Sequence, residues 1–288
     1  MKRCIMTSIL ALGLASSLSA QSVERDLAYG PRDGNTLDLY LPAGEGAAPV
    51  VMFIHGGRWF RNDKSQIELY GRIEALTGAG IAVASINHTY SSEALWPAQR
   101  EDVLAALRFL TENGTELGMD PDHLAVWGQS SGAHLALWSA LVDLESDAIE
   151  VDAVVSWYAP SNLSQLTEDR ANDDVPGANE RFPEPSPESQ LIGVPVPENP
   201  EAADAASPER ALAALEKDVR LPPFFLVHGD ADQVVSPLQS VRLMETLQAH
   251  GTDVSLRIVA GGGHGGDGFE AVVPEVVDFL RPILIPDR

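Results

Sequence analysis

A serine with a glycine two residues away on each side stands between two apolar runs. The sequence is GQSSG at 128–132, with Ser130 at its centre. The run 124–127 before it is short and apolar, as buried parallel strands are, and 133–144 after it has apolar residues at helical spacing. A strand, a tight turn and a helix in this order expose a serine hydroxyl near the positive end of the helix. The pattern predicts that Ser130 is a nucleophile.

A serine hydroxyl is a weak nucleophile at neutral pH, so it needs a base and a group that orients this base. His264 is the candidate base, because it follows an expected strand and lies among five glycines in GGGHGG at 261–266. Two carboxylates, Asp230 and Asp232, follow another expected strand. We expect Asp232 to orient His264 and Asp230 to brace the loop, but spacing alone leaves the choice between them open.

Backbone N–H donors for the oxyanion of a tetrahedral intermediate are expected in the sequence HGGRW at 55–59. This stretch follows an expected strand, and its consecutive glycines let N–H groups approach a ligand closely. Gly57 and Arg58 are the expected donors from this loop, and Gly56 is the weaker candidate. Ser131, which follows the candidate nucleophile, is the expected donor from the helix.

Three further residues are candidates for substrate contact, namely Gly56, Trp59 and Trp96. Trp59 could line the acyl or leaving-group pocket, or it could pack under its loop. Trp96 follows another expected strand, and core packing is the commoner role for such a residue. His134 lies one helical turn after the candidate nucleophile and is expected to pack.

No metal ion and no cofactor is expected. No other histidine, cysteine or pair of acids has metal-ligand spacing with His264. A hydroxyl nucleophile, an imidazole base and backbone donors complete this chemistry by themselves.

Apolar runs and helix-like stretches alternate along the chain and must position these residues. The expected strands are 50–54, 81–86, 124–127, 151–157, 224–228 and 256–259, and the expected helices are 67–77, 100–110, 133–144, 209–217, 237–249 and 272–280. This alternation predicts an α/β fold with a mostly parallel central sheet and helices on both faces. Segments 25–29 and 36–40 are expected to add an antiparallel edge. The candidate residues all follow strands, where such sheets bind ligands.

One segment, 168–204, does not fit this alternation. It contains ten acids, two arginines and seven prolines, with few large apolar residues. We expect no regular helix or strand of any length in it. It could form a lid over the site, or a solvated acidic loop without a catalytic role, and the second interpretation is slightly favoured.

Residues 1–20 have the pattern of a secretion signal. Lys2 and Arg3 precede the apolar stretch 5–18, which is too short for a comfortable membrane span, and small residues suitable for cleavage follow. A buried N-terminal helix is the alternative. Removal of the signal would leave a domain at 21–288 in the periplasm or outside the cell. Cys4, the only cysteine, lies in the signal, so the mature chain would have no disulfide.

Composition limits the classes of partner. The formal net charge is −23, from 42 acids and 19 bases, and loss of the two basic residues of the signal would make it −25. Nucleic-acid binding needs clustered Lys and Arg, so this charge excludes a nucleic-acid partner. No second apolar run has membrane length, so no membrane span is expected after signal removal. The length suits one large domain, and oligomeric state is not predicted.

The ordered motifs resemble those of the α/β-hydrolase fold carboxylesterases. The resemblance is strongest to the feruloyl and acetyl-xylan esterases, with ties to the hormone-sensitive-lipase-like esterases. It rests on HGGRW at 55–59, DKS at 63–65, GQSSGAHL at 128–135, HGDAD at 228–232 and GHGG at 263–266. The resemblance implies Ser130, Asp232 and His264 as the catalytic triad, and it favours Asp232 over Asp230.

Two features depart from this family pattern. Arg58 stands where the third glycine of an HGGG sequence is common, and its side chain could narrow the site or bind an acidic substrate. The acidic segment 168–204 is unlike the compact members. Both departures leave the substrate class open.

These observations predict an exported serine carboxylesterase that hydrolyses short-chain or aromatic acyl esters through an acyl-enzyme. The substrate would be a small-molecule or polysaccharide-linked ester. The first alternative is an arylformamidase, because the sequence HGGRW at 55–59 also resembles the HGGxW stretch of those enzymes. A prolyl-oligopeptidase-type peptidase and a non-catalytic binding protein on the same fold are lesser alternatives.

Overall fold

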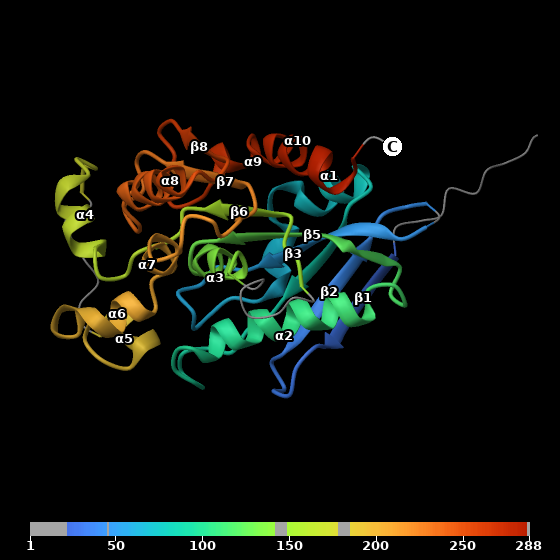
Figure 1. Ribbon diagram of the computed structural model, residues 1–288, viewed down its shortest axis with the longest axis horizontal. Coiled ribbons are helices and arrows are strands. Elements are labelled where there is room, and N and C mark those ends of the chain that lie inside the picture. Colours follow the sequence, from blue (N-terminus) through green and yellow to red (C-terminus); the bar gives the residue numbers. More distant parts are fainter. Residues whose placement is uncertain (1–21, 45, 142–148, 178–184, 287–288) are drawn as a thin grey trace, which may run out of the picture.

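The computed structural model describes residues 22–44, 46–141, 149–177 and 185–286, and the expected signal at 1–20 lies outside them. Within these residues, eight strands form one sheet in the order β1-β2-β4-β3-β5-β6-β7-β8 (Figure 1). The strands are β1 (Ser22–Ala28), β2 (Thr36–Leu41), β3 (Ala48–Ile54), β4 (Ala82–Ile86), β5 (Met119–Gln129), β6 (Ala153–Trp157), β7 (Phe224–Gly229) and β8 (Val254–Val259).

Strands β3 to β8 are parallel, and β1 and β2 pair antiparallel at one edge. The predicted mostly parallel sheet and its antiparallel edge are therefore confirmed. The expected strand at 124–127 is the buried end of a longer strand, because β5 also pairs with β3 at Met119 and Asp120.

The main helices are α1 (Arg72–Gly78), α2 (Ala98–Asn113), α3 (Ser131–Ser139), α7 (Pro208–Ala213), α8 (Leu238–His250), α9 (Asp267–Glu270) and α10 (Val273–Leu284). The prediction of a helix at 67–77 is wrong for the first half of this range. A 3-10 helix, η1 (Lys64–Gly71), occupies it, and Tyr70 and Gly71 have positive φ values of 64° and 63° that separate it from α1. The end of the expected helix 133–144 lies partly outside the described residues.

Alternate side chains of each central strand point into two separate cores. Val50, Met52 and Ile54 of β3 pack with apolar residues of α2, α3, α7 and α8. Val51 and Phe53 pack on the other face with residues of α1 and α10. Figure 1 shows α1 and α10 on one side of the sheet and α2 and α3 on the other. This arrangement fixes the strand ends that carry the candidate residues.

The expectation of an irregular acidic loop at 168–204 is wrong. Its described residues form α4 (Leu166–Asn172), α5 (Pro187–Ile192), the 3-10 helix η3 (Val196–Glu198) and α6 (Pro200–Ala205), which gather at one end of the sheet in Figure 1. Proline is the first residue of α5 and α6 and the second of η3, at positions where its missing N–H is not needed. Leu191, Val196 and Ala203 are buried in the core on the side of the sheet that carries α2 and α3. The described part of the segment therefore packs on the domain.

Among the described residues, no helix has both the length and the apolar character that crossing a membrane requires.

Candidate active site

Ser130 occupies a strained turn between β5 and α3. Its φ and ψ are 53° and −125°, an uncommon conformation for a residue with a side chain. A Cβ at Gly128 would lie 2.2 Å from the Gly132 oxygen, and one at Gly132 would lie 2.2 Å from the Ile54 oxygen. Only glycine fits at both positions, so the expected tight turn is confirmed.

The structure brings Ser130, His264 and Asp232 together from the ends of three strands. His264 Nε2 lies 2.8 Å from Ser130 Oγ, and His264 Nδ1 lies 2.7 Å from Asp232 Oδ2. The carboxylate accepts a hydrogen bond from Nδ1–H, which leaves Nε2 without a proton and able to accept the hydroxyl proton. The Asp232 side chain is fully buried, whereas that of His264 is 20% exposed.

The Asp232 carboxylate has further donors around it. Oδ1 accepts hydrogen bonds from the N–H groups of Val234 (2.8 Å) and Val235 (3.0 Å), and His228 Nε2 lies 3.3 Å from Oδ2. Burial raises the pKa of the Asp232 carboxyl, but hydrogen bonds and charge from His228 and His264 outweigh it, and the pKa falls below its ordinary range. The carboxylate is therefore ionised at neutral pH.

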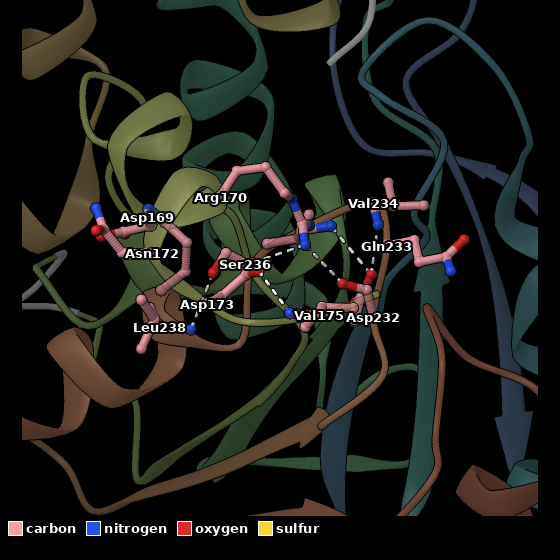
Figure 2. A network of polar contacts seen from close by, with 12 residues as sticks. Asp169, Arg170, Asn172, Asp173, Val175, Asp232, Gln233, Val234, Ser236 and Leu238 are labelled. Carbon is pink, nitrogen blue, oxygen red and sulfur yellow. Dashed lines mark hydrogen bonds and ion pairs between the residues drawn. The ribbon is translucent and has the colours of Figure 1, made fainter. Parts of the chain in front are cut away.

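A buried arginine of the acidic segment fixes the loop that carries Asp232. Arg170 Nη1 donates to the main-chain oxygen of Asp232 at 2.9 Å and to Asp173 Oδ2 at 2.7 Å. Figure 2 shows these three residues pointing toward one another, with Asp173 Oδ1 accepting from the Val175 N–H. Helix α4 is thus part of the support of the site.

Asp230 takes the bracing place expected for it. Its Oδ1 accepts a hydrogen bond of 2.7 Å from the Gly261 N–H, at the start of the loop that carries His264. The two carboxylates therefore act on the same histidine loop in different ways, one on the ring and one on the backbone.

The expected oxyanion donors border two adjoining cavities beside Ser130. Gly57 and Arg58 line a cavity of about 250 Å³ that His264 also lines, and Arg58 and Ser131 line a narrow one of about 20 Å³. Gly56 lies in the wider cavity, but its N–H donates to Gln66 Oε1 at 2.7 Å and is not available to a ligand. A larger cavity of about 450 Å³ lies at the amino ends of β3 and β5, away from Ser130.

Arg72 is a buried cation near the glycine loop that follows β3. Arg72 is fully buried, with its guanidinium 4.8–5.2 Å from the ring centres of Phe53, Tyr70, Trp127 and Trp157. Among the described residues, no carboxylate pairs with it. Burial lowers the pKa of Arg72 to about 10, so it remains charged at neutral pH.

The hydrogen bonds of Arg72 join the two halves of the site. Nη2 donates to Oε1 of Gln129, the residue before Ser130, at 2.5 Å. Nη1 donates to the main-chain oxygen of Gln66 at 3.2 Å. Gln66 in turn holds the Gly56 N–H. Arg72 therefore connects the glycine loop after β3 with the turn after β5.

Trp59 and Trp96 differ in their relation to the cavities. Trp59 is 1% exposed, lines the narrow cavity and donates from Nε1 to His134 Nδ1 at 3.3 Å. Trp96 lies against the rings of His134 and Trp138, at 5.5 and 5.3 Å, and lines neither cavity beside Ser130. His134 Nε2 donates to the Ala206 oxygen at 2.7 Å, so it packs as expected and also holds α6.

Sequence reasoning missed four supporting residues, namely Gln66, Arg72, Arg170 and Tyr158. Tyr158 follows β6, lines the wider cavity and lies with its ring centre 4.6 Å from that of His264. Its place directly after an expected strand is a signal that could have identified it. Arg72 and Arg170 lie in helices and have no comparable signal. In the described part of the chain, no cluster of three metal-ligating side chains occurs.

A parallel sheet with a nucleophile-like serine after β5, and a histidine between that serine and a buried aspartate, defines an α/β-hydrolase fold protein. The chain matches the BD-FAE family model over residues 37–247 and belongs to that family. The expected resemblance to carboxylesterases of this fold is therefore confirmed.

Curated relatives carry esterase names. The chain is 28% identical to the isoprenylcysteine alpha-carbonyl methylesterase of Arabidopsis thaliana, across 90% of this chain and 60% of the relative. It is 30% identical to esterase LipQ of Mycobacterium tuberculosis, across 75% of this chain and 50% of that protein. The chain thus spans only between half and three fifths of these relatives.

Solved structures of similar size share the fold. A truncated carbohydrate esterase from gut microbiota has a TM-score of 0.77 and 29% identity, covering 92% of this chain and 97% of that one. Carboxyl esterase 2 from Tuber melanosporum has a TM-score of 0.75 at 22% identity, covering 94% and 90% of the two chains, and shows the likeness of fold alone.

Proposed function

We propose that this protein is an exported serine carboxylesterase that hydrolyses short-chain or aromatic acyl esters. The observation that carries the proposal is the position of His264, with one ring nitrogen 2.8 Å from Ser130 Oγ and the other 2.7 Å from Asp232 Oδ2. This is the geometry by which an imidazole takes a hydroxyl proton while a carboxylate stabilises the imidazolium that forms.

The reaction has two halves. Ser130 Oγ attacks the acyl carbon as His264 Nε2 takes the hydroxyl proton, and the N–H groups of Gly57, Arg58 and Ser131 stabilise the oxyanion. His264 then gives that proton to the leaving alcohol oxygen, and an acyl-enzyme remains on Ser130. A water molecule loses a proton to His264 and attacks the acyl carbon, and His264 returns that proton to Ser130 Oγ as the acid is released.

The narrow cavity supports a small acyl group. Trp59, Pro160, Pro187 and Val235 are among the residues that line it around Ser130, and its volume is about 20 Å³. Pro187 comes from α5, so the acidic segment would form part of the wall of the acyl site. The likeness to a carbohydrate esterase supports a polysaccharide-linked ester as the natural substrate.

Export is proposed from the pattern at residues 1–20. Expression of the full chain in a Gram-negative host, followed by fractionation and N-terminal sequencing, tests it. A new N-terminus near residue 21 in the periplasm or medium supports export, and an intact Met1 in the cytoplasm contradicts it.

Hydrolysis of p-nitrophenyl esters from acetate to decanoate, by the chain from residue 21 and by its Ser130→Ala variant, tests the activity. We expect the fastest turnover with acetate or butyrate and none above background in the variant. A folded protein without turnover on any ester would contradict the esterase proposal. Parallel assays on an aryl formamide distinguish the esterase from an arylformamidase, because an arylformamidase would hydrolyse the formamide faster than the esters.

A further inference from the structure

Two arginines line the same cavity as Ser130 and His264. They are Arg58 and Arg61, and the other polar side chains in this lining are Asn62, Gln66 and Gln129, besides the tyrosine. The described residues of this lining include no Asp or Glu. In a chain with 42 acids and 19 bases, this cavity has the opposite charge balance from the whole protein.

The charge of Arg61 acts on Arg58. Burial lowers the pKa of Arg58, and the charge of Arg61 lowers it further, whereas Glu188 on the neighbouring narrow cavity opposes both effects. Like charges near one another, one of them partly buried, raise the free energy of the empty site. An anion bound between them would lower it.

Glu188 lies near only one of these two arginines. It lines the narrow cavity with Arg58, while Arg61 is absent from that lining. Within the described residues, Arg61 has no carboxylate partner in an ion pair, and its guanidinium lies 6.0 Å from the centre of the Phe60 ring. Arg61 is also exposed at the cavity mouth, where an incoming ligand can reach it.

We propose that Arg58 and Arg61 form an anion subsite that selects esters carrying a carboxylate group near the scissile bond. This inference rests on the proposed esterase function and names its substrate class. Guanidinium groups suit the task, because their planar N–H donors match the two oxygens of a carboxylate. The anionic group would lie in the wider cavity while the acyl carbon lies beside Ser130.

The net charge of the protein sets the conditions of the test. At low salt a charge of −23 repels anions over long range, which would oppose the effect of the subsite. At an ionic strength of about 0.15 M the screening length is about 8 Å, so the distant acids are screened and contacts inside the cavity persist. Rates should therefore be compared at that ionic strength.

Two pairs of esters measure the preference, each consisting of a carboxylate and its neutral methyl ester, and each kcat/KM is divided by the rate constant of uncatalysed hydrolysis to remove differences in intrinsic reactivity. Mono-p-nitrophenyl glutarate and its methyl ester place the charge on the acyl side, and 4-acetoxybenzoate and its methyl ester place it on the alcohol side. We expect kcat/KM to favour the anionic member of at least one pair about tenfold, as one charge-assisted hydrogen bond would give.

Arginine variants connect that preference to the subsite. Arg61→Gln is expected to lower the ratio of anionic to neutral kcat/KM about tenfold, and Arg61→Lys is expected to retain part of it. Arg58→Gln should lower the ratio as well. The matched control is Arg257→Gln, an exposed arginine of β8 outside both cavities, which changes the net charge equally and should leave the ratio as in the parent.

Binding to Ser130→Ala separates this inference from the proposed function. Calorimetric titration with 4-acetoxybenzoate and with its methyl ester needs no turnover. The subsite is supported if Ser130→Ala binds the anion more tightly than the methyl ester and if the double variant Ser130→Ala with Arg61→Gln loses this difference. This holds even if the parent hydrolyses no ester. Equal binding and equal kcat/KM within both pairs would overturn the subsite, even if the parent is an active esterase.

Discussion

Arg170 Nη1 donates a 2.9 Å hydrogen bond to the main-chain oxygen of Asp232, so an arginine of α4 holds the residue that partners His264. Arg170 is 6% exposed and its ion-pair partner Asp173 is 2% exposed. A buried ion pair contributes little net stability but is costly to break, and it fixes one arrangement of the groups around it. The proline-rich segment therefore helps to position the proposed catalytic acid (Figure 2).

Replacing Arg170 with methionine should lower both stability and activity. The change leaves the Asp173 carboxylate buried without its cation, which costs about 3–5 kcal/mol of unfolding free energy. It also frees the Asp232 loop, and a displacement of about 1 Å there would lower kcat by up to about 100-fold. Urea unfolding and p-nitrophenyl acetate hydrolysis at a temperature where the variant is folded measure the two effects.

Asp173→Asn is the matched control for this effect. It removes the same ion pair but leaves the hydrogen bond from Arg170 to the Asp232 oxygen. Stability should fall in this variant while kcat falls much less than in Arg170→Met. Equal kcat losses in the two folded variants would show that the hydrogen bond to Asp232 does not position the acid.

The two aspartates after β7 should differ sharply in their effect on kcat. Asp232→Asn retains the shape of the side chain but loses the charge that stabilises the imidazolium, so kcat should fall by about 10³–10⁴-fold. Asp230→Asn retains an oxygen that can accept from the Gly261 N–H, and kcat should fall less than about tenfold. Steady-state measurement of kcat for both variants at about pH 7.5 tests this difference. A larger fall in kcat for Asp230→Asn than for Asp232→Asn would identify Asp230 as the partner of His264.

Much of the site could be predicted because its residues lie at strand ends. Ser130, Asp232 and His264 each follow an apolar run with glycine nearby, and parallel strands bring their ends to one edge of the sheet. Their assembly thus followed from topology once the alternation of strands and helices was identified. The order of the strands could not be predicted, because it depends on crossovers that leave no local pattern.

The supporting contacts could not be predicted, because they depend on burial that composition conceals. Segment 168–204 is acidic and proline-rich, yet Leu191, Val196 and Ala203 of its described part are buried in the core on the α2 and α3 side of the sheet. Arg72 stands in an ordinary helical sequence, and only the three-dimensional arrangement surrounds it with four aromatic rings. In both cases some of the deciding partners are far away in the sequence, as Gln129 is from Arg72.

Replacing Arg72 should weaken the proposed oxyanion site more than substrate binding. Arg72→Met leaves Gln129 Oε1 buried without its donor and frees the Gln66 backbone, so the glycine loop and the serine turn lose their connection. A lost buried hydrogen bond of this kind costs about 1–3 kcal/mol, which corresponds to a fall in kcat of about 5–150-fold. KM should change by less than about threefold, because ground-state contacts remain.

A boronic acid that forms a tetrahedral adduct with serine gives an independent measure of this effect. Its affinity should fall in parallel with kcat in Arg72→Met. Arg72→Lys keeps the charge but cannot reach both partners, so its values should lie between those of the parent and the methionine variant. A folded Arg72→Met protein with parental kcat and boronate affinity would contradict the connecting role.

Acid should destabilise the fold through His134. Burial lowers the pKa of His134 from 6.5 to about 4, and the charge of His88 lowers it further, although the hydrogen bond to the Ala206 oxygen raises it. Between pH 6.5 and 4 the unfolded chain binds a proton that the folded protein excludes, so stability falls as the pH falls through this range. The shift corresponds to about 3 kcal/mol at the acid end.

His134→Gln tests this sign directly, because an amide can donate and accept in the same place but does not titrate. Its melting temperature at pH 7 should be lower than that of the parent, while the drop in melting temperature from pH 7 to pH 5 should be smaller. His250→Gln, a change at the end of α8, serves as the control and should keep the parental drop. If both variants show the parental drop, the acid sensitivity comes from groups other than His134, and the pair His55 and His88, whose pKa values burial also lowers, is the next to be replaced.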